Sequence, residues 1–220
     1  GSRMKSDVPK QYLSLKGKPV LYYALKAFED SFIDEIVLVT GVGQEDYCQK
    51  EIVEHYGFQK VSHVIAGGKE RYDSVYRGIC ALEDADYVYI HDGARPFIDN
   101  ALLCRARDTV EQYHACAAGM TSKDTIKLIN EQGFVRETPE RKYTWIIQTP
   151  QVFEYTLIRG AYEKMYQNMP AVQITDDAMV VERETSQKVK LIPGSYKNIK
   201  VTTPEDLVIA ELYLKENAGR

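Results

Sequence analysis

The stretch Tyr87-Val88-Tyr89-Ile90-His91-Asp92-Gly93-Ala94-Arg95-Pro96-Phe97 decides how the rest of the chain is arranged. A short apolar run that is closed by a tight turn predicts a buried strand. In open α/β sheets, ligands bind at the carboxyl edge, where this strand would end. Asp92 and Arg95 could there hold a metal ion and an anion side by side. They could equally be an ion pair that only braces the turn, and the stretch alone does not separate the two interpretations.

The composition is that of an ordinary globular protein, without the excess of positive charge that nucleic-acid binding needs. The chain has 220 residues, is 44% hydrophobic and 27% charged, and carries a net charge of -4. This length suits a single domain, which we expect to span residues 1–220. Because there is no global excess of positive charge, an anionic ligand must be held by a local group of cations.

The cysteines and histidines show no pattern of a metal site or a disulfide framework. The four cysteines are scattered without a C-x-x-C pair, and the four histidines lack the spacing of metal ligands. Buried thiols in a reducing compartment are therefore expected. With no apolar run that could span a bilayer and no signal peptide, we expect a cytoplasmic protein, or a plastid protein if the source is a plant or alga.

Strands and helices alternate along most of the chain. Besides the stretch above, strands are predicted at residues 36–40, 61–66 and 115–120. Helical spacing occurs at residues 20–28, up to about 56, up to about 82, and from 99 to about 110. This alternation with short connections predicts an α/β domain with a Rossmann-like, mostly parallel sheet and helices on both faces.

Residues 121–149 break this alternation. Residues 125–129 and 133–136 look like two strands about a turn at residues 130–133. An exposed hairpin with apolar residues needs a partner, so this segment predicts a protruding dimerisation arm. Beyond the arm, we expect helices at 154–165, 176–184 and 204–215 and a strand at 188–192.

Two further segments could contact phosphates, and each has a simpler explanation. Gly67 and Gly68 stand between a strand and a helix, where they would allow a ligand to approach the backbone closely. A glycine pair also commonly just forms a turn. Residues 3–18 are rich in lysine and form either a mobile terminus or a basic loop that folds over phosphates.

Taken together, separate segments resemble one family, 2-C-methyl-D-erythritol 4-phosphate cytidylyltransferase, over essentially the whole chain. The matching segments are Gly1-Ser2-Arg3-Met4, Pro9-Lys10-Gln11-Tyr12, Gly67-Gly68-Lys69-Glu70-Arg71-Tyr72-Asp73-Ser74-Val75, His91-Asp92-Gly93-Ala94-Arg95-Pro96, Asp124-Thr125-Ile126-Lys127, Gln148-Thr149-Pro150-Gln151, Ile174-Thr175-Asp176 and Asn198-Ile199-Lys200-Val201-Thr202. The resemblance implies transfer of a cytidylyl group from CTP to methylerythritol phosphate, with release of pyrophosphate, in the non-mevalonate route to isoprenoids. It also implies a divalent metal, usually Mg²⁺, and a homodimer with a protruding arm.

The resemblance also implies a role for particular residues. The implied catalytic residues, which grip the CTP phosphates, are Arg3, Lys10 and Lys200, and Asp92 would hold the metal. CTP would be bound by Gly1, Gly68 and Ser74. The sugar phosphate would be bound by Arg95, Thr125, Arg141 and Thr175, with the hairpin residues coming from the partner subunit. Simpler roles remain open: the two threonines could be ordinary strand or cap residues, and Arg141 could pair with Glu137 or Glu140.

The chain departs from the family pattern at two places. Members begin with a strand and a Gly-rich loop, of which only residues 1–4 match, so we expect that strand and most of that loop to be missing upstream. Lys69 stands where some relatives have an acidic residue. Two other functions stay open: a ribitol-5-phosphate cytidylyltransferase, and a catalytically silent binding protein that keeps the fold.

Overall fold

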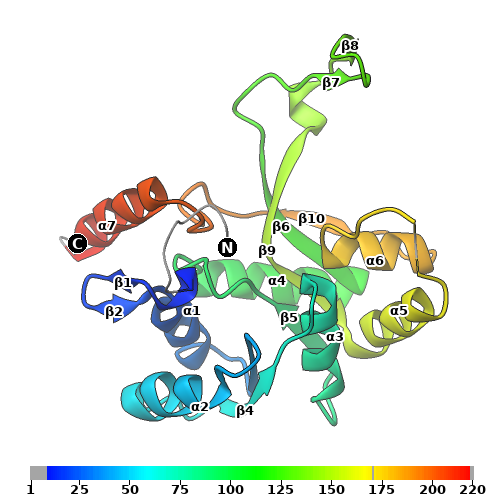
Figure 1. The fold of residues 1–220 in the computed structure, drawn as a ribbon. Helices are drawn as coiled ribbons and strands as arrows, with labels where there is room; N and C mark the ends of the chain where they lie inside the picture. The colour runs from blue at the N-terminus through cyan, green and yellow to red at the C-terminus, as the bar shows by residue number, and fades with distance from the viewer. Residues whose placement is uncertain (1–8, 170, 219–220) are drawn as a thin grey trace.

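A four-stranded mixed sheet forms the centre of the molecule (Figure 1). The computed structural model describes residues 9–169 and 171–218. The strand order is β10 (Lys190–Pro193), β6 (Ala115–Thr121), β9 (Trp145–Glu154) and β5 (Tyr87–Ile90). Strand β10 runs parallel to β6, whereas β9 runs antiparallel to both β6 and β5.

Strand β9 explains how the observed sheet differs from the predicted one. The α/β class is confirmed, but the main sheet is mixed because β9 lies antiparallel between β6 and β5. The sequence does not predict this strand, because Gln148, Thr149 and Gln151 interrupt the apolar pattern. All three side chains are buried, and the two glutamines bond neighbouring loops.

Shorter sheets and the helices complete the fold. Strands β3 (Ile36–Thr40) and β4 (Val61–Ala66) form a separate parallel pair. Two small antiparallel pairs consist of β1 (Ser14–Leu15) with β2 (Lys18–Pro19) and β7 (Leu128–Ile129) with β8 (Val135–Glu137). The helices are α1 (Val20–Glu29), α2 (Glu45–Tyr47) with the π-helix η2 (Cys48–Glu54), α3 (Arg71–Cys80), α4 (Asn100–Tyr113), α5 (Tyr155–Gln167), α6 (Asp177–Glu184), α7 (Pro204–Ala218) and the 3-10 turns η1 (Lys10–Tyr12) and η3 (Arg141–Tyr143).

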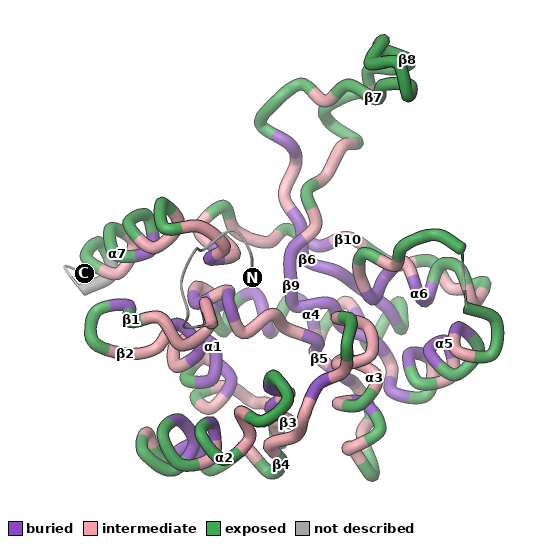
Figure 2. Tube along the Cα trace, in the orientation of Figure 1, coloured by how far each residue is buried: buried purple, intermediate pink, exposed green. Residues whose placement is uncertain are grey.

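Helices cover both faces of the main sheet, as the sequence predicts. Alternate residues of a strand point to opposite faces. On β9, Phe153 packs with buried residues of α5 and α6, whereas Val152 packs with buried residues of α4. The tube in Figure 2 shows this buried centre between the two helical layers. No helix in the described part of the chain is both long enough and apolar enough to cross a bilayer.

The predicted hairpin projects from the body as an arm. Strands β6 and β9 lead out to residues 122–144, which stand clear of the body in Figure 1 and are almost entirely exposed in Figure 2. The predicted turn is present, with Gly133 at a positive φ of 85° and a hydrogen bond of 2.9 Å from the Asn130 amide to the Phe134 carbonyl. The paired strands are shorter than expected, and the arm leaves Ile129, Phe134 and Val135 exposed by 60%, 72% and 58%.

A cavity of about 840 Å³ separates the main sheet from the β3–β4 pair. Every residue of β3 and of β5 lines this cavity, as expected if the backbone edge of each strand borders it. Among the described residues, each of these strands has one hydrogen-bonded neighbour, on the side away from this cavity. Lys10, Arg71, Asp92 and Lys200 are among its charged lining residues.

Candidate functional site

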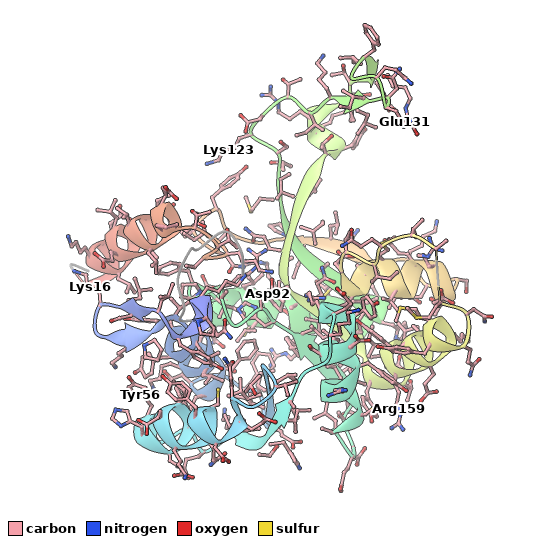
Figure 3. The ribbon with its side chains drawn as sticks, viewed as in Figure 1. Lys16, Tyr56, Asp92, Lys123, Glu131 and Arg159 are labelled. Carbon is pink, nitrogen blue, oxygen red and sulfur yellow. The ribbon has the colours of Figure 1, made fainter. Side chains whose placement is uncertain are left out.

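Three cations surround the carboxylate of Asp92, which lies just beyond the end of β5 (Figure 3). Lys200 Nζ lies 2.8 Å from Asp92 Oδ2, Arg95 Nε lies 3.5 Å from the same oxygen, and Arg71 Nε lies 3.4 Å from Oδ1. Burial alone would raise the pKa of Asp92, but the ammonium of Lys200 and the guanidinium of Arg71 outweigh it and hold the pKa well below its usual range. The carboxylate is therefore ionised at neutral pH.

Backbone hydrogen bonds bring these groups together. The Arg95 amide donates to the Asp92 carbonyl over 2.9 Å, which closes the predicted turn. The Val201 amide donates to the Ala94 carbonyl over 2.8 Å, and Arg95 Nη1 donates to the Asn198 carbonyl over 2.8 Å. The turn after β5 thus holds the segment that carries Lys200. Arg95 does brace the turn, but within a larger charged cluster.

His91 supports the same turn from inside the core. Its Nε2 donates to the Arg95 carbonyl over 3.1 Å, which leaves Nδ1 to accept from the Thr149 hydroxyl over 3.0 Å. That hydroxyl in turn accepts from the Asp92 amide over 3.1 Å. Burial lowers the pKa of His91 to about 4, so the ring is neutral at physiological pH. Both ring nitrogens of His91 are thus engaged in holding the turn that carries Asp92.

Arg71 and Asp177 form the part of the site that sequence analysis missed. Arg71, the first residue of α3, donates from Nη1 and Nη2 to the two oxygens of Asp177 over 3.0 and 2.8 Å. Asp177 begins α6, and its side chain is fully buried. Asp177 outweighs the effect of burial, so the pKa of Arg71 is raised above its already high value. Both residues belong to or adjoin segments that match the family, but nothing in the linear sequence shows that they pair.

The glycine pair forms a turn before α3, and Ser74 of α3 contacts it. The Gly68 amide donates to Ser74 Oγ over 3.1 Å, and the Gly67 amide donates to the Thr40 carbonyl over 2.7 Å. A Cβ added at Gly68 would overlap the side chain of Asp73, so a larger residue does not fit there. Ser74 also lines the cavity, as do Lys10 and Lys200. Of the residues predicted to bind CTP or its phosphates, Lys10, Ser74 and Lys200 thus line the same cavity, and Gly68 contacts Ser74.

The remaining predicted site residues either lie away from Asp92 or fall outside the residues that the structure describes. Arg141 Nη2 donates to Thr125 Oγ1 over 3.0 Å, so the two residues lie together, but on the exposed arm, which stands away from Asp92 in Figure 3. Thr175 is exposed in the turn before α6, and its hydroxyl contacts Met179 Sδ at 3.6 Å. Gly1 and Arg3 lie outside the described residues.

The arrangement can bind an anion although the chain is acidic overall. Arg71, Arg95 and Lys200 face Asp92 and Asp177, which leaves an excess of one positive charge beside the cavity. In the described part of the chain, no group of three or more His, Cys, Asp or Glu side chains could hold a metal ion. A metal at Asp92 would therefore take its other ligands from water and from a bound phosphate, an arrangement typical of Mg²⁺.

Comparisons with known proteins show the family to which the chain belongs. The family model of 2-C-methyl-D-erythritol 4-phosphate cytidylyltransferase matches residues 1–216. Curated proteins of that name from Lachnoclostridium phytofermentans and Lachnospira eligens are 48% and 49% identical, over 99% and 98% of this chain and 93% and 95% of theirs. The crystal structure of 4-diphosphocytidyl-2C-methyl-D-erythritol synthase from Anaerococcus prevotii has a TM-score of 0.86 at 35% identity, covering 97% of this chain and 93% of its own. The chain belongs to the 2-C-methyl-D-erythritol 4-phosphate cytidylyltransferase family.

Proposed function

We propose that this chain transfers a cytidylyl group from CTP to 2-C-methyl-D-erythritol 4-phosphate, giving CDP-methylerythritol and pyrophosphate, in the non-mevalonate pathway. The observation that carries the proposal is the single carboxylate held among three cations at the end of a cavity that Lys10 also lines. Two polyanions must meet in this reaction, so positive charge near the reacting atoms is the first requirement. The names of the relatives match this chemistry.

The reaction needs positioning and charge neutralisation more than it needs a base. The phosphate oxygen of methylerythritol phosphate attacks the α-phosphorus of CTP, and pyrophosphate leaves. A phosphate monoester is already ionised near neutral pH, so no general base is required. In our proposal Lys10 and Arg3 hold the CTP phosphates, and Lys200 leaves Asp92 to neutralise charge on the α-phosphate.

Asp92 fits a magnesium ion that arrives with the nucleotide. Its carboxylate is ionised and 14% exposed, and it supplies the hard oxygen ligands that Mg²⁺ prefers. Bound Mg²⁺ would neutralise charge on the phosphates. Gly1, Gly68 and Ser74 would contact the nucleotide, and Arg95 and Thr175 the sugar phosphate.

The arm completes the site in a homodimer. We infer that the arm of one subunit reaches the cavity of the other and brings Thr125 and Arg141 to the sugar phosphate. The hydrogen bond between these two residues and the exposed apolar residues Ile129, Phe134 and Val135 support this placement. A hairpin this small is not expected to be stable without a partner surface.

One assay tests the assignment. Pyrophosphate release from CTP is measured with methylerythritol phosphate and with ribitol 5-phosphate side by side, with Asp92→Asn as the inactive control. We expect turnover with methylerythritol phosphate only. Faster turnover with ribitol 5-phosphate would move the chain to the other cytidylyltransferase class. Absence of turnover with both, while CTP still binds, would identify a silent binding protein.

A further inference from the structure

We propose that Asp177 and Tyr162 are positioning residues that hold the guanidinium of Arg71 against Asp92. The role in turnover rests on the function proposed above, whereas the placement of Arg71 stands on the geometry alone. The four residues form a chain of hydrogen bonds. Tyr162 Oη donates to Asp177 Oδ1 over 2.7 Å, and the carboxylate of Asp177 accepts hydrogen bonds from both terminal nitrogens of Arg71. Arg71 Nε in turn faces Asp92 Oδ1 at 3.4 Å.

The guanidinium of Arg71 is divided between two carboxylates. A guanidinium is planar and rigid, so a two-point bond to Asp177 fixes the direction in which Nε points. Here it points at Asp92. The side chain of Arg71 is 34% exposed and lines the cavity, so the same group also faces any ligand bound there.

Asp177, which holds Arg71, is itself held through its backbone by Gln151 and through its carboxylate by Tyr162. The backbone amides of Asp177 and Ala178 donate to Gln151 Oε1 over 3.0 and 2.9 Å, and Gln151 is only 1% exposed. Tyr162 is fully buried and stacks on Tyr76 with ring centroids 5.8 Å apart and an interplanar angle of 11°. Burial and the neighbouring Asp177 raise the pKa of Tyr162, so its hydroxyl remains a proton donor.

This arrangement is more than a brace between helices. A surface ion pair would tolerate many geometries and contribute little. Asp177 is completely buried, its Oδ1 accepts from the hydroxyl of the buried Tyr162, and both of its oxygens accept from Arg71. A small displacement of Asp177 would therefore move Arg71, and with it the orientation of the Asp92 carboxylate. We expect such a displacement to lower kcat more than it raises either KM.

Tyr162→Phe is the sharpest variant, because it removes one hydroxyl and keeps the ring in place. Tyr155→Phe is its matched control, because Tyr155 lies on the same helix and is 7% exposed. Its hydroxyl donates to the Leu82 carbonyl and accepts from Arg159 Nη1, each over 2.8 Å, and bonds neither Asp177 nor Arg71. We expect Tyr162→Phe to lower kcat about tenfold with both KM values changed less than about twofold. Tyr155→Phe should lose comparable stability without a change in kcat per folded molecule.

A double-mutant cycle tests whether Tyr162 acts through Arg71. In an Arg71→Lys background, which lacks the two-point bond, Tyr162→Phe should cause no further loss of kcat. The Nε–H resonance of Arg71 gives a readout that does not depend on activity. It is assigned by its disappearance in Arg71→Lys, and its hydrogen exchange should accelerate in Tyr162→Phe and in Asp177→Asn but not in Tyr155→Phe.

The outcomes separate this proposal from the proposed function. If the wild type shows no turnover, the function is wrong, and the exchange of the Arg71 Nε–H still decides whether Asp177 and Tyr162 hold it. The proposal is overturned if Tyr162→Phe leaves that exchange unchanged. It is also overturned if an active wild type and Tyr162→Phe have the same kcat, or if the losses of kcat in the cycle are independent.

Discussion

Lys200 Nζ lies 2.8 Å from Asp92 Oδ2, so the loop before α7 supplies the nearest cation to the carboxylate at the end of β5. The Lys200 side chain is 34% exposed, whereas Asp92 is 14% exposed and keeps two other cations within 3.5 Å. Lys200 can therefore move from Asp92 to an incoming phosphate, because Arg71 and Arg95 still balance the negative charge of the Asp92 carboxylate. This relationship gives the first prediction.

Lys200→Ala should lower turnover by about 100-fold or more, because it removes positive charge that is needed most in the transition state. The free energy of unfolding should fall by less than about 1 kcal/mol, since Arg71 and Arg95 still face Asp92. Lys197→Ala is the control on the same loop, because Lys197 pairs with Glu216 at 2.7 Å instead. Steady-state pyrophosphate release and urea unfolding of both variants check the prediction. Equal activity in the two variants would contradict it.

Lys10→Ala should abolish measurable turnover without unfolding the protein. Lys10 lies in the 3-10 turn η1 and lines the same cavity as Asp92 and Lys200, where it would face the CTP phosphates. Loss of such a contact typically costs on the order of 100-fold in rate. Lys50→Ala, an exposed lysine of η2, is the control. Circular dichroism and pyrophosphate release are measured on each, and a Lys10→Ala variant with a near-normal rate would exclude this role.

Stability should fall as the pH falls, in part because of His91. In the unfolded chain this histidine takes up a proton near pH 6.5, whereas in the folded protein its pKa is about 4. Between these values the unfolded state binds the extra proton, so stability that is present above pH 6.5 is lost as the pH drops toward 4. From pH 6.5 to 5 this amounts to about 2 kcal/mol.

Urea unfolding at several pH values checks this contribution of His91. His91→Gln should show a shallower loss of stability than the wild type over that range. If the slopes of His91→Gln and the wild type coincide, His91 does not have the low pKa that its burial implies.

The parts of the fold that sequence analysis predicted are those encoded locally. Strand β5, its closing turn and the helix after it follow from adjacent residues, and Asp99 caps α4 by accepting from the Leu102 amide over 2.7 Å. The hydrogen bond between Gly68 and Ser74 likewise joins neighbours in the chain. Local conformational preferences are sufficient for such features.

The parts that sequence analysis missed depend on contacts between distant segments. Strand β9 carries polar residues that are buried only because Gln148 and Gln151 bond the loops on either side of the sheet. Arg71 and Asp177 likewise come together only when α3 and α6 pack against the same sheet. No local pattern specifies which arginine will meet which carboxylate.

The arm should make the protein a dimer in solution. Its tip exposes Phe134 by 72%, more apolar surface than an isolated hairpin is expected to leave in water. Phe134→Asp should shift light scattering from dimer to monomer and reduce turnover, while circular dichroism stays unchanged. Val208→Asp, at a 62% exposed position on α7, is the control. A wild-type monomer with full activity would contradict the proposed role of the arm.

Arg141 should determine the affinity for methylerythritol phosphate but not for CTP. Its guanidinium already bonds Thr125 over 3.0 Å, so both groups are presented together on the arm. Arginine binds phosphate through a two-point geometry that lysine reproduces poorly. Arg141→Lys should therefore raise the KM for methylerythritol phosphate roughly 10- to 150-fold, which corresponds to about 1.5–3 kcal/mol. The KM for CTP should stay within about twofold.

The competing explanation is that Arg141 only stabilises the exposed arm. An ion pair on a solvated hairpin contributes at most about 1 kcal/mol and touches neither substrate. Glu140, one candidate partner, instead pairs with Lys142 at 2.9 Å. Arg136→Lys, on strand β8 of the same arm, is the matched control and should change neither KM. Steady-state kinetics with each substrate varied in turn decides the matter: small, equal changes in both KM values for Arg141→Lys would show that Arg141 is structural and that the sugar-phosphate site lies elsewhere.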